Sequence, residues 1–147
     1  MEFLPISIRI NNQPILIIGG GNVALHKIVL LKRFTNSFRV IAPDILPEIK
    51  QIQGVEYVEK VYEPDDLKGF RLVYITTDKT DLNQQIADHA KALGCLVNVA
   101  DNPSCSDFVS PAIYVDRHMT VAVGSDGKDV LASVKLRDKL KLWLSEN

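Results

Sequence analysis

The feature that most constrains this chain is an apolar run that ends in three consecutive glycines. Ile15–Ile18 is continuously apolar, which is typical of a strand covered on both faces in a parallel sheet. Gly19–Gly21 follow at once, and apolar residues then recur at helical spacing from Asn22 to about Phe34. The sequence therefore predicts a strand, a tight glycine turn and a helix, which is the start of a βαβ unit.

The same alternation of strands and helices continues through the first hundred residues. Further strands are predicted at Phe38–Ala42, Val55–Val61, Arg71–Ile75 and Cys95–Val99, and further helices over about Ile45–Gln53 and Leu82–Leu93. Strands that alternate with helices at this interval pair in parallel through right-handed crossovers. The predicted fold class is therefore α/β, a Rossmann-like doubly wound parallel sheet.

The pattern changes after residue 101. Phe108–Val115 and Met119–Val123 read as the two strands of a hairpin, and Val130–Leu144 carries a broad apolar stripe at helical spacing. One hairpin and one helix are too little for an independent core, so this part should pack on the first part or on a second copy of the chain. We place the domain boundary between residues 108 and 109, giving domains 1–108 and 109–147.

Composition excludes several classes of function. The 147 residues carry 17 basic and 18 acidic side chains, so no overall field attracts nucleic acid or anionic lipid. No apolar run reaches the roughly 18 residues of a membrane span, and the first residues do not resemble a secretory leader. Cys95 and Cys105 are too few for a disulfide framework or a four-thiolate zinc site. We expect a cytoplasmic protein with reduced thiols and with neither nucleic-acid nor membrane partners.

The glycine turn matches the G-x-G-x-x-A fingerprint of dinucleotide-binding folds. Gly19 permits the tight turn, Gly21 leaves room for a pyrophosphate, and Ala24 lets the helix approach the strand, so that amides at the helix start face the phosphates. The alternative is a glycine turn that serves only the sheet.

The next acidic residue bears on the choice of cofactor. Asp44 lies where this fingerprint usually places a carboxylate for the adenosine ribose, although it could instead cap the helix near Ile45. Apart from Arg39 inside the strand, no arginine stands beside it to bind a 2'-phosphate, which favours NAD over NADP. Asp78, after the fourth strand, is interpreted as a helix cap. The predicted cofactor-binding residues are Gly19, Gly21, Asn22, Val23, Ala24, Pro43, Asp44, Thr76 and Thr77.

An acidic residue also follows the fifth strand. Ligands of open α/β sheets bind beyond the carboxyl ends of the strands, where Asp101 could act as a base beside the nicotinamide. By residue type alone, an Asx-turn with Asn102-Pro103 is the more frequent role of such an aspartate.

Taken together, these motifs resemble the siroheme synthase amino-terminal module, a family of precorrin-2 dehydrogenases of which some are also sirohydrochlorin ferrochelatases. The resemblance runs in order from about Leu4 to Val123. The segments that carry it are Gly19–Ala24, Ile41–Pro43, Thr76–Asp78 with Leu82-Asn83, Asn98–Asp101, Phe108 with Pro111-Ala112, and Asp116-Arg117.

The resemblance implies an activity and a set of partners. The family's fold is an NAD-binding Rossmann domain followed by a region in which two subunits interlock as a homodimer. Asp101 matches its catalytic aspartate, which serves the oxidation of precorrin-2 to sirohydrochlorin and, in some members, insertion of Fe²⁺. A carboxylate is suited to accept the proton that leaves the macrocycle. Substrate binding is assigned to Asn98, Arg117, Ser125 and Lys128, whose cationic members suit the carboxylates of a tetrapyrrole.

The chain also departs from the family. Relatives show a Gly-Gly-x-Ser-Pro segment where this sequence reads Asp126-Gly127-Lys128-Asp129-Val130, and the family's helical C-terminal extension is not expected after Asn147. Chelatase activity therefore stays open. A transient contact of Fe²⁺ with Cys105 and Asp107 is conceivable, but no resident metal site is predicted. The alternative function is a non-catalytic NAD(H)-sensing module that regulates a partner protein and needs no Asp101.

Overall fold

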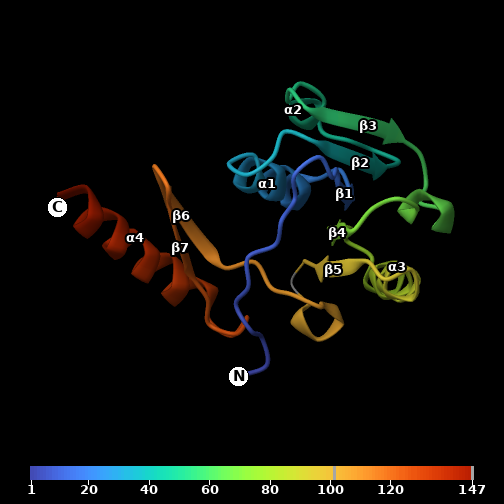
Figure 1. Cartoon of the computed structure of the whole chain (residues 1–147). Coiled ribbons are helices and arrows are strands. Elements are labelled where there is room, and N and C mark those ends of the chain that lie inside the picture. Colours follow the sequence, from blue (N-terminus) through green and yellow to red (C-terminus); the bar gives the residue numbers. More distant parts are fainter. Residues whose placement is uncertain (101, 147) are drawn as a thin grey trace. The chain divides into compact units, whose positions relative to one another are not determined.

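The computed structural model describes residues 1–100 and 102–146, and the chain divides into two compact units (Figure 1). The sheet unit is Ser7–Phe108, and the hairpin unit joins Met1–Ile6 to the chain from Val109 onward. The first six residues thus group with the hairpin unit, which the sequence did not indicate.

The sheet unit is built around five parallel strands in the order β3-β2-β1-β4-β5. The strands are β1 Ile15–Ile18, β2 Phe38–Ala42, β3 Val55–Glu59, β4 Leu72–Ile75 and β5 Leu96–Val99. The connecting helices are α1 Asn22–Leu31, α2 Pro47–Lys50 and α3 Thr80–Ala92, with short 3₁₀ turns η1 at Pro64–Leu67 and η2 at Pro103–Cys105. This topology confirms the predicted Rossmann-like fold, because the strand order reverses next to β1.

The central strands β1 and β4 are apolar without alternation because helices cover both faces of the sheet there. On one face, Ile17 and Tyr74 belong to a core cluster with Ala24 and Ile28 of α1. On the other face, a second cluster joins residues of β1, β4 and β5 to α3. Figure 1 shows α1 beside β1 and α3 beside β5.

Helix α2 is much shorter than the predicted Ile45–Gln53. It contains Pro47–Lys50 only, and Leu46 precedes it in an extended conformation. The backbone before Pro47 is bound to the glycine turn instead, since the Leu46 N–H donates to the Gly20 carbonyl over 2.9 Å. A proline at the first helical position fits this late start.

The hairpin unit contains β6 Ala112–Asp116, β7 Met119–Val123 and α4 Val130–Glu146. The strands pair antiparallel. Strand β6 begins later than the predicted Phe108, because Phe108 belongs to the sheet unit and Pro111 has no N–H for a ladder. Among the described residues of this unit only Ser133 is buried, and Trp143 is 61% exposed. No described helix has both the length and the apolar character of a membrane span.

Candidate functional site

The glycine turn and the end of β4 lie side by side at the carboxyl edge of the sheet. The Gly19 N–H donates to the Ile41 carbonyl of β2 over 2.9 Å. Thr76 donates to the Ile18 carbonyl both from its N–H, over 2.8 Å, and from its hydroxyl, over 3.2 Å. These hydrogen bonds continue the parallel ladder past the strand ends and fix the turn against its neighbours.

The three glycines meet different surroundings. Gly19 has a φ of +126°, and a Cβ there would lie 2.3 Å from the Thr76 Oγ1 atom. A Cβ on Gly20 would lie 2.2 Å from the Asp44 carbonyl oxygen, whereas a Cβ on Gly21 would meet nothing within 4 Å. Gly19 and Gly20 are therefore required by the fold, but Gly21 is not. Open space at Gly21 is what a bound pyrophosphate needs.

Helix α1 begins at this open space, and no acidic side chain in its first turn neutralises its free amides. Gly21 is the N-cap residue, no side chain caps the helix, and its first turn contains no acidic residue. The first amides of a helix have no partner within it and carry its positive dipole end. Asn22 and Val23 are exposed, and Ala24 is fully buried against the sheet. This end of α1 is suited to an anion such as a pyrophosphate.

Pro43 and Asp44 are exposed directly after β2. Asp44 does not cap α2, because the N-cap residue is Leu46 and it receives no side-chain hydrogen bond. The cap interpretation of Asp44 is therefore wrong. The contact of Asp44 with the adenosine ribose stays a prediction.

The turn after β4 is held by a residue that the sequence did not single out as functional. Asn83 of α3 is 8% exposed, and its Nδ2 donates to the Thr77 carbonyl over 2.9 Å while its Oδ1 pairs with the Thr77 hydroxyl. The Thr77 hydroxyl also accepts the Lys79 N–H over 3.2 Å. Lys79 is the N-cap residue of α3, so the predicted cap at Asp78 is wrong.

At the end of β5, Asn98 is 5% exposed, and its Nδ2 donates to the Phe108 carbonyl over 3.0 Å. Its Oδ1 is buried without a hydrogen-bond partner. The predicted catalytic residue, Asp101, lies outside the described residues. Its two neighbours in the chain are anchored, since Ala100 donates to the Ile75 carbonyl over 2.9 Å and Asn102 donates to the Val99 carbonyl over 3.1 Å.

The other predicted substrate residues belong to the hairpin unit. Arg117 is exposed in the turn between β6 and β7, with a φ of +45°. The Ser125 hydroxyl accepts the Asp129 N–H over 2.8 Å, just before α4. The Lys128 ammonium lies 3.4 Å from the Asp126 carboxylate.

Asp126 begins the segment in which this chain departs from the glycine-rich family pattern. Its φ is +61°, and its carboxylate accepts the backbone N–H groups of Phe3, at 2.9 Å, and Glu2, at 3.0 Å. These two N–H groups, followed by Lys128, lower the pKa of the Asp126 carboxyl. The altered loop therefore holds the N-terminal segment.

The side chains considered for a transient iron contact are already engaged. The Asp107 carboxylate accepts the Val97 N–H over 3.0 Å and lies 3.7 Å from the Lys91 ammonium. The Cys105 thiol lies 2.7 Å from the Gln84 Oε1 atom. An iron contact would have to displace these partners.

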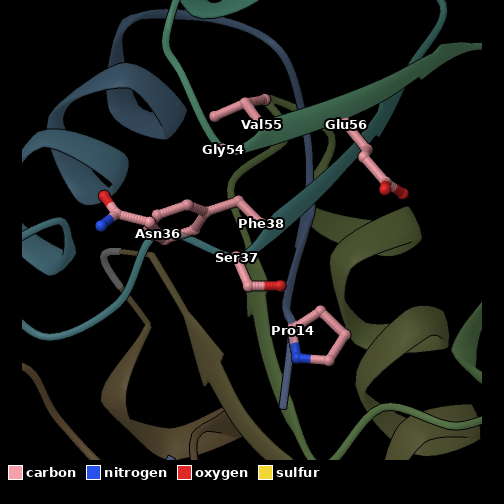
Figure 2. Close-up of a pocket in the computed structure, with 7 residues that line it drawn as sticks. All are labelled: Pro14, Asn36, Ser37, Phe38, Gly54, Val55 and Glu56. Carbon is pink, nitrogen blue, oxygen red and sulfur yellow. The ribbon is translucent and has the colours of Figure 1, made fainter. Parts of the chain in front are cut away.

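A hollow of about 370 Å³ lies at the opposite, amino edge of the sheet. Figure 2 shows its lining, which includes Pro14 before β1, Ser37 before β2 and Gly54 before β3. Its acidic side chain, Glu56, pairs with Arg39 at 3.9 Å. This hollow lies away from the carboxyl strand ends, where α/β sheets bind ligands.

Comparisons with known proteins identify the family of the chain. Residues 6–112 match the family described as "Putative NAD(P)-binding". The chain is 37% identical over 145 residues to a siroheme synthase of Ectopseudomonas mendocina (strain ymp), and 37% identical over 144 residues to one of Chromobacterium violaceum. These matches cover 98% and 96% of this chain but only 31% of each relative, so the chain spans about a third of their length.

A solved structure shares the fold. It is SirC, a precorrin-2 dehydrogenase, with a TM-score of 0.81 and 20% sequence identity over 95% of this chain and 70% of that chain. These similarities confirm the resemblance to siroheme synthases, and the family match confirms the expected nicotinamide dinucleotide cofactor.

Proposed function

Because the chain belongs to the NAD(P)-binding family that it matches over residues 6–112, we propose that it is an NAD-dependent dehydrogenase that oxidises precorrin-2 to sirohydrochlorin. The observation that carries the proposal is the open space at Gly21, in front of the uncapped start of α1. The names of the relatives, siroheme synthase and precorrin-2 dehydrogenase, support the choice of substrate.

In this proposal the dinucleotide lies along the carboxyl edge of the sheet. Amides of Asn22, Val23 and Ala24 bind the pyrophosphate, and Gly19 and Gly21 shape the turn that receives it. Asp44, exposed after Pro43, binds the adenosine ribose hydroxyls, and its negative charge disfavours the 2'-phosphate of NADP. Thr76 and Thr77 line the nicotinamide end, and both are fixed by the hydrogen bonds of the β4 turn.

The reaction removes a hydride and a proton from the macrocycle. Bound NAD supplies the hydride acceptor. Asp101 accepts the proton as a general base, which requires its carboxylate to be ionised before the transfer. The anchored backbone of Ala100 and Asn102 supports this role, because a base must be held within hydrogen-bond reach of its proton.

The substrate is a tetrapyrrole with several carboxylates on its rim. Arg117 and Lys128 are proposed to bind these carboxylates, with the Ser125 hydroxyl as a neutral partner. Asn98 contributes indirectly in this scheme, because its buried amide holds the Phe108 carbonyl. Insertion of Fe²⁺ into sirohydrochlorin is a second candidate activity, in which Asp101 would deprotonate pyrrole N–H groups and the macrocycle itself would bind the metal.

We also propose that the protein is a homodimer through its hairpin unit. Large apolar side chains of this unit are exposed: Met119 is 69% exposed, Leu131 73%, Leu142 62% and Trp143 61%. A hairpin and a helix that bury so little do not form a stable core alone. A second copy of the same unit would cover these side chains.

Turnover of precorrin-2 tests the proposed function. Purified protein with precorrin-2 and NAD should form NADH and the absorbance spectrum of sirohydrochlorin in equal amounts. Asp101→Ala should lose this turnover and keep NADH affinity. Asp78→Ala is the matched control, because Asp78 is an exposed aspartate at the same edge of the sheet to which no role is assigned. Wild-type protein that binds NADH but does not turn over would instead support the sensing module.

A further inference from the structure

The outer edge of β5 is covered by the chain that follows it. Because β5 is an end strand of the sheet, its odd-numbered residues direct their backbone groups away from β4. The edge segment, which we define as Asn102–Phe108, folds back along this side. Unpaired strand edges are aggregation-prone, and covering them is a common solution.

Every outward backbone group of Val97 and Val99 has a partner in the edge segment. Val97 donates to the Asp107 carboxylate over 3.0 Å and accepts the Asp107 N–H over 2.8 Å. Val99 donates to the Ser106 hydroxyl over 2.9 Å, and its carbonyl accepts the Asn102 N–H over 3.1 Å. The far end of the segment is held by Asn98, which donates to the Phe108 carbonyl.

Ser106 differs from the other members of the edge segment because one hydroxyl group joins two places in the chain. Its oxygen accepts the Val99 N–H, and its hydrogen points to the Asn102 carbonyl, 2.9 Å away, with the Val99 carbonyl at 3.3 Å. Val99 and Asn102 stand on the two sides of position 101. The Ser106 hydroxyl therefore fixes the distance between the backbone before this position and the backbone after it.

We propose that Ser106 is a positioning residue for the dehydrogenation, acting through the loop that carries Asp101. The inference rests on the proposed function, since it concerns the same carboxylate. Ser106 need not touch substrate or cofactor. Loss of its hydroxyl leaves the Val99 N–H and the Asn102 carbonyl without this partner, and the loop then samples more conformations. Small displacements of a reacting group lower the rate of the chemical step far more than they lower binding.

Three variants test this role. Ser106→Ala removes the hydroxyl, and Ser106→Thr retains it and should rescue. Ser104→Ala is the matched control, because Ser104 lies in the same segment and its hydroxyl contacts side chains, donating to the Asn102 Oδ1 atom over 2.6 Å and lying 3.9 Å from the Cys105 thiol. Each protein is assayed with precorrin-2 and NAD, with kcat expressed per NADH-binding site so that misfolded protein does not count.

For Ser106→Ala we expect kcat to fall by about 10- to 100-fold, while the KM for NAD and the affinity for NADH stay within about twofold. Ser106→Thr should recover most of the loss, and Ser104→Ala should behave as wild type. If the wild type turns over precorrin-2 and Ser106→Ala has the same kcat per site, the role of Ser106 is wrong and the proposed function is unaffected. A wild type without turnover would overturn the proposed function, and this inference with it.

Discussion

The sheet unit and the hairpin unit bury their apolar side chains to very different extents. Every buried apolar side chain among the described residues lies in the sheet unit, whose two faces are covered by helices of the same chain. The hairpin unit leaves Leu131 and Trp143 largely exposed, although its helix is the longest in the molecule. The sheet unit therefore has an apolar core within the chain, whereas we propose that the hairpin unit is covered by a second copy.

Truncating one large apolar side chain in each unit should show this difference most strongly. Ile17 is fully buried at the centre of the sheet, so Ile17→Ala should lower the free energy of unfolding by about 2–5 kcal/mol. Leu142 is 62% exposed, so Leu142→Ala should change it by less than about 0.5 kcal/mol in dilute, monomeric protein. Chemical denaturation at low concentration measures both. Equal losses would mean that the hairpin unit has a core of its own.

The glycine turn provides a second comparison, within the sheet unit. Gly20→Ala forces a Cβ against the Asp44 backbone and should destabilise the fold by about 1–3 kcal/mol. Gly21→Ala should leave the stability nearly unchanged, because its Cβ enters open space. Thermal unfolding of the two variants compares them directly. A stability loss at Gly21 equal to that at Gly20 would contradict the idea that Gly21 is kept for a ligand.

The exposed face of α4 should matter for assembly rather than for folding. Trp143→Ala is expected to weaken dimerisation by more than about 1 kcal/mol, because large aromatic side chains dominate interfaces. Light scattering over a concentration series should show wild type at twice 16.4 kDa and the variant shifted toward monomer. A monomeric wild type at micromolar concentration would refute the dimer.

Alkaline pH should affect the sheet unit through Tyr62. Burial, followed by Asp66 and Cys95, raises the pKa of the Tyr62 phenol to about 12. Since the folded-state pKa is raised, the stability that this phenol contributes is complete below its ordinary pKa and is lost as pH rises toward 12. Ultraviolet titration should show one tyrosine that ionises at higher pH than the others in wild type, and this step should be missing in Tyr62→Phe. A phenol that titrates near its ordinary pKa would contradict the burial.

Acid should affect the hairpin unit, with the smallest effect of the series. The lowered pKa of Asp126 means that its contacts with Phe3 and Glu2 are complete at neutral pH and are lost as pH falls through the folded-state pKa. The amide resonances of Phe3 and Glu2 should shift with that titration, and Asp126→Asn should remove the dependence. Unchanged resonances would show that Asp126 does not hold this segment.

The sequence predicted the parts of the fold that depend on local pattern. The strands β1 and β4 were found because buried parallel strands are continuously apolar. The cap predicted at Asp78 was wrong, and the cap given as the alternative for Asp44 is not formed, because neither helix start uses a side-chain cap. Both caps were inferred from residue type, which does not determine where a helix begins.

The roles of Gly20, Asn83 and Ser106 could not be predicted from a local sequence pattern. Gly20 occupies the variable position of the fingerprint, and its need for glycine comes from the Asp44 backbone, 24 residues along the chain. Asn83 and Ser106 have ordinary surface-type side chains whose partners are set by the packing of α3 and of the β5 edge. Contacts of this kind follow from tertiary structure and carry no signal in a single sequence.

Titration of NADH into the wild type and Gly21→Ala tests the central claim most directly. Gly124→Ala serves as the control, because a Cβ there also meets open space but lies in the hairpin unit. If the turn before α1 holds the cofactor phosphates, wild type and Gly124→Ala should bind NADH alike, and Gly21→Ala should bind at least about tenfold more weakly with unchanged stability. A wild type that does not bind NADH, or a Gly21→Ala variant that binds it equally well, would contradict the account.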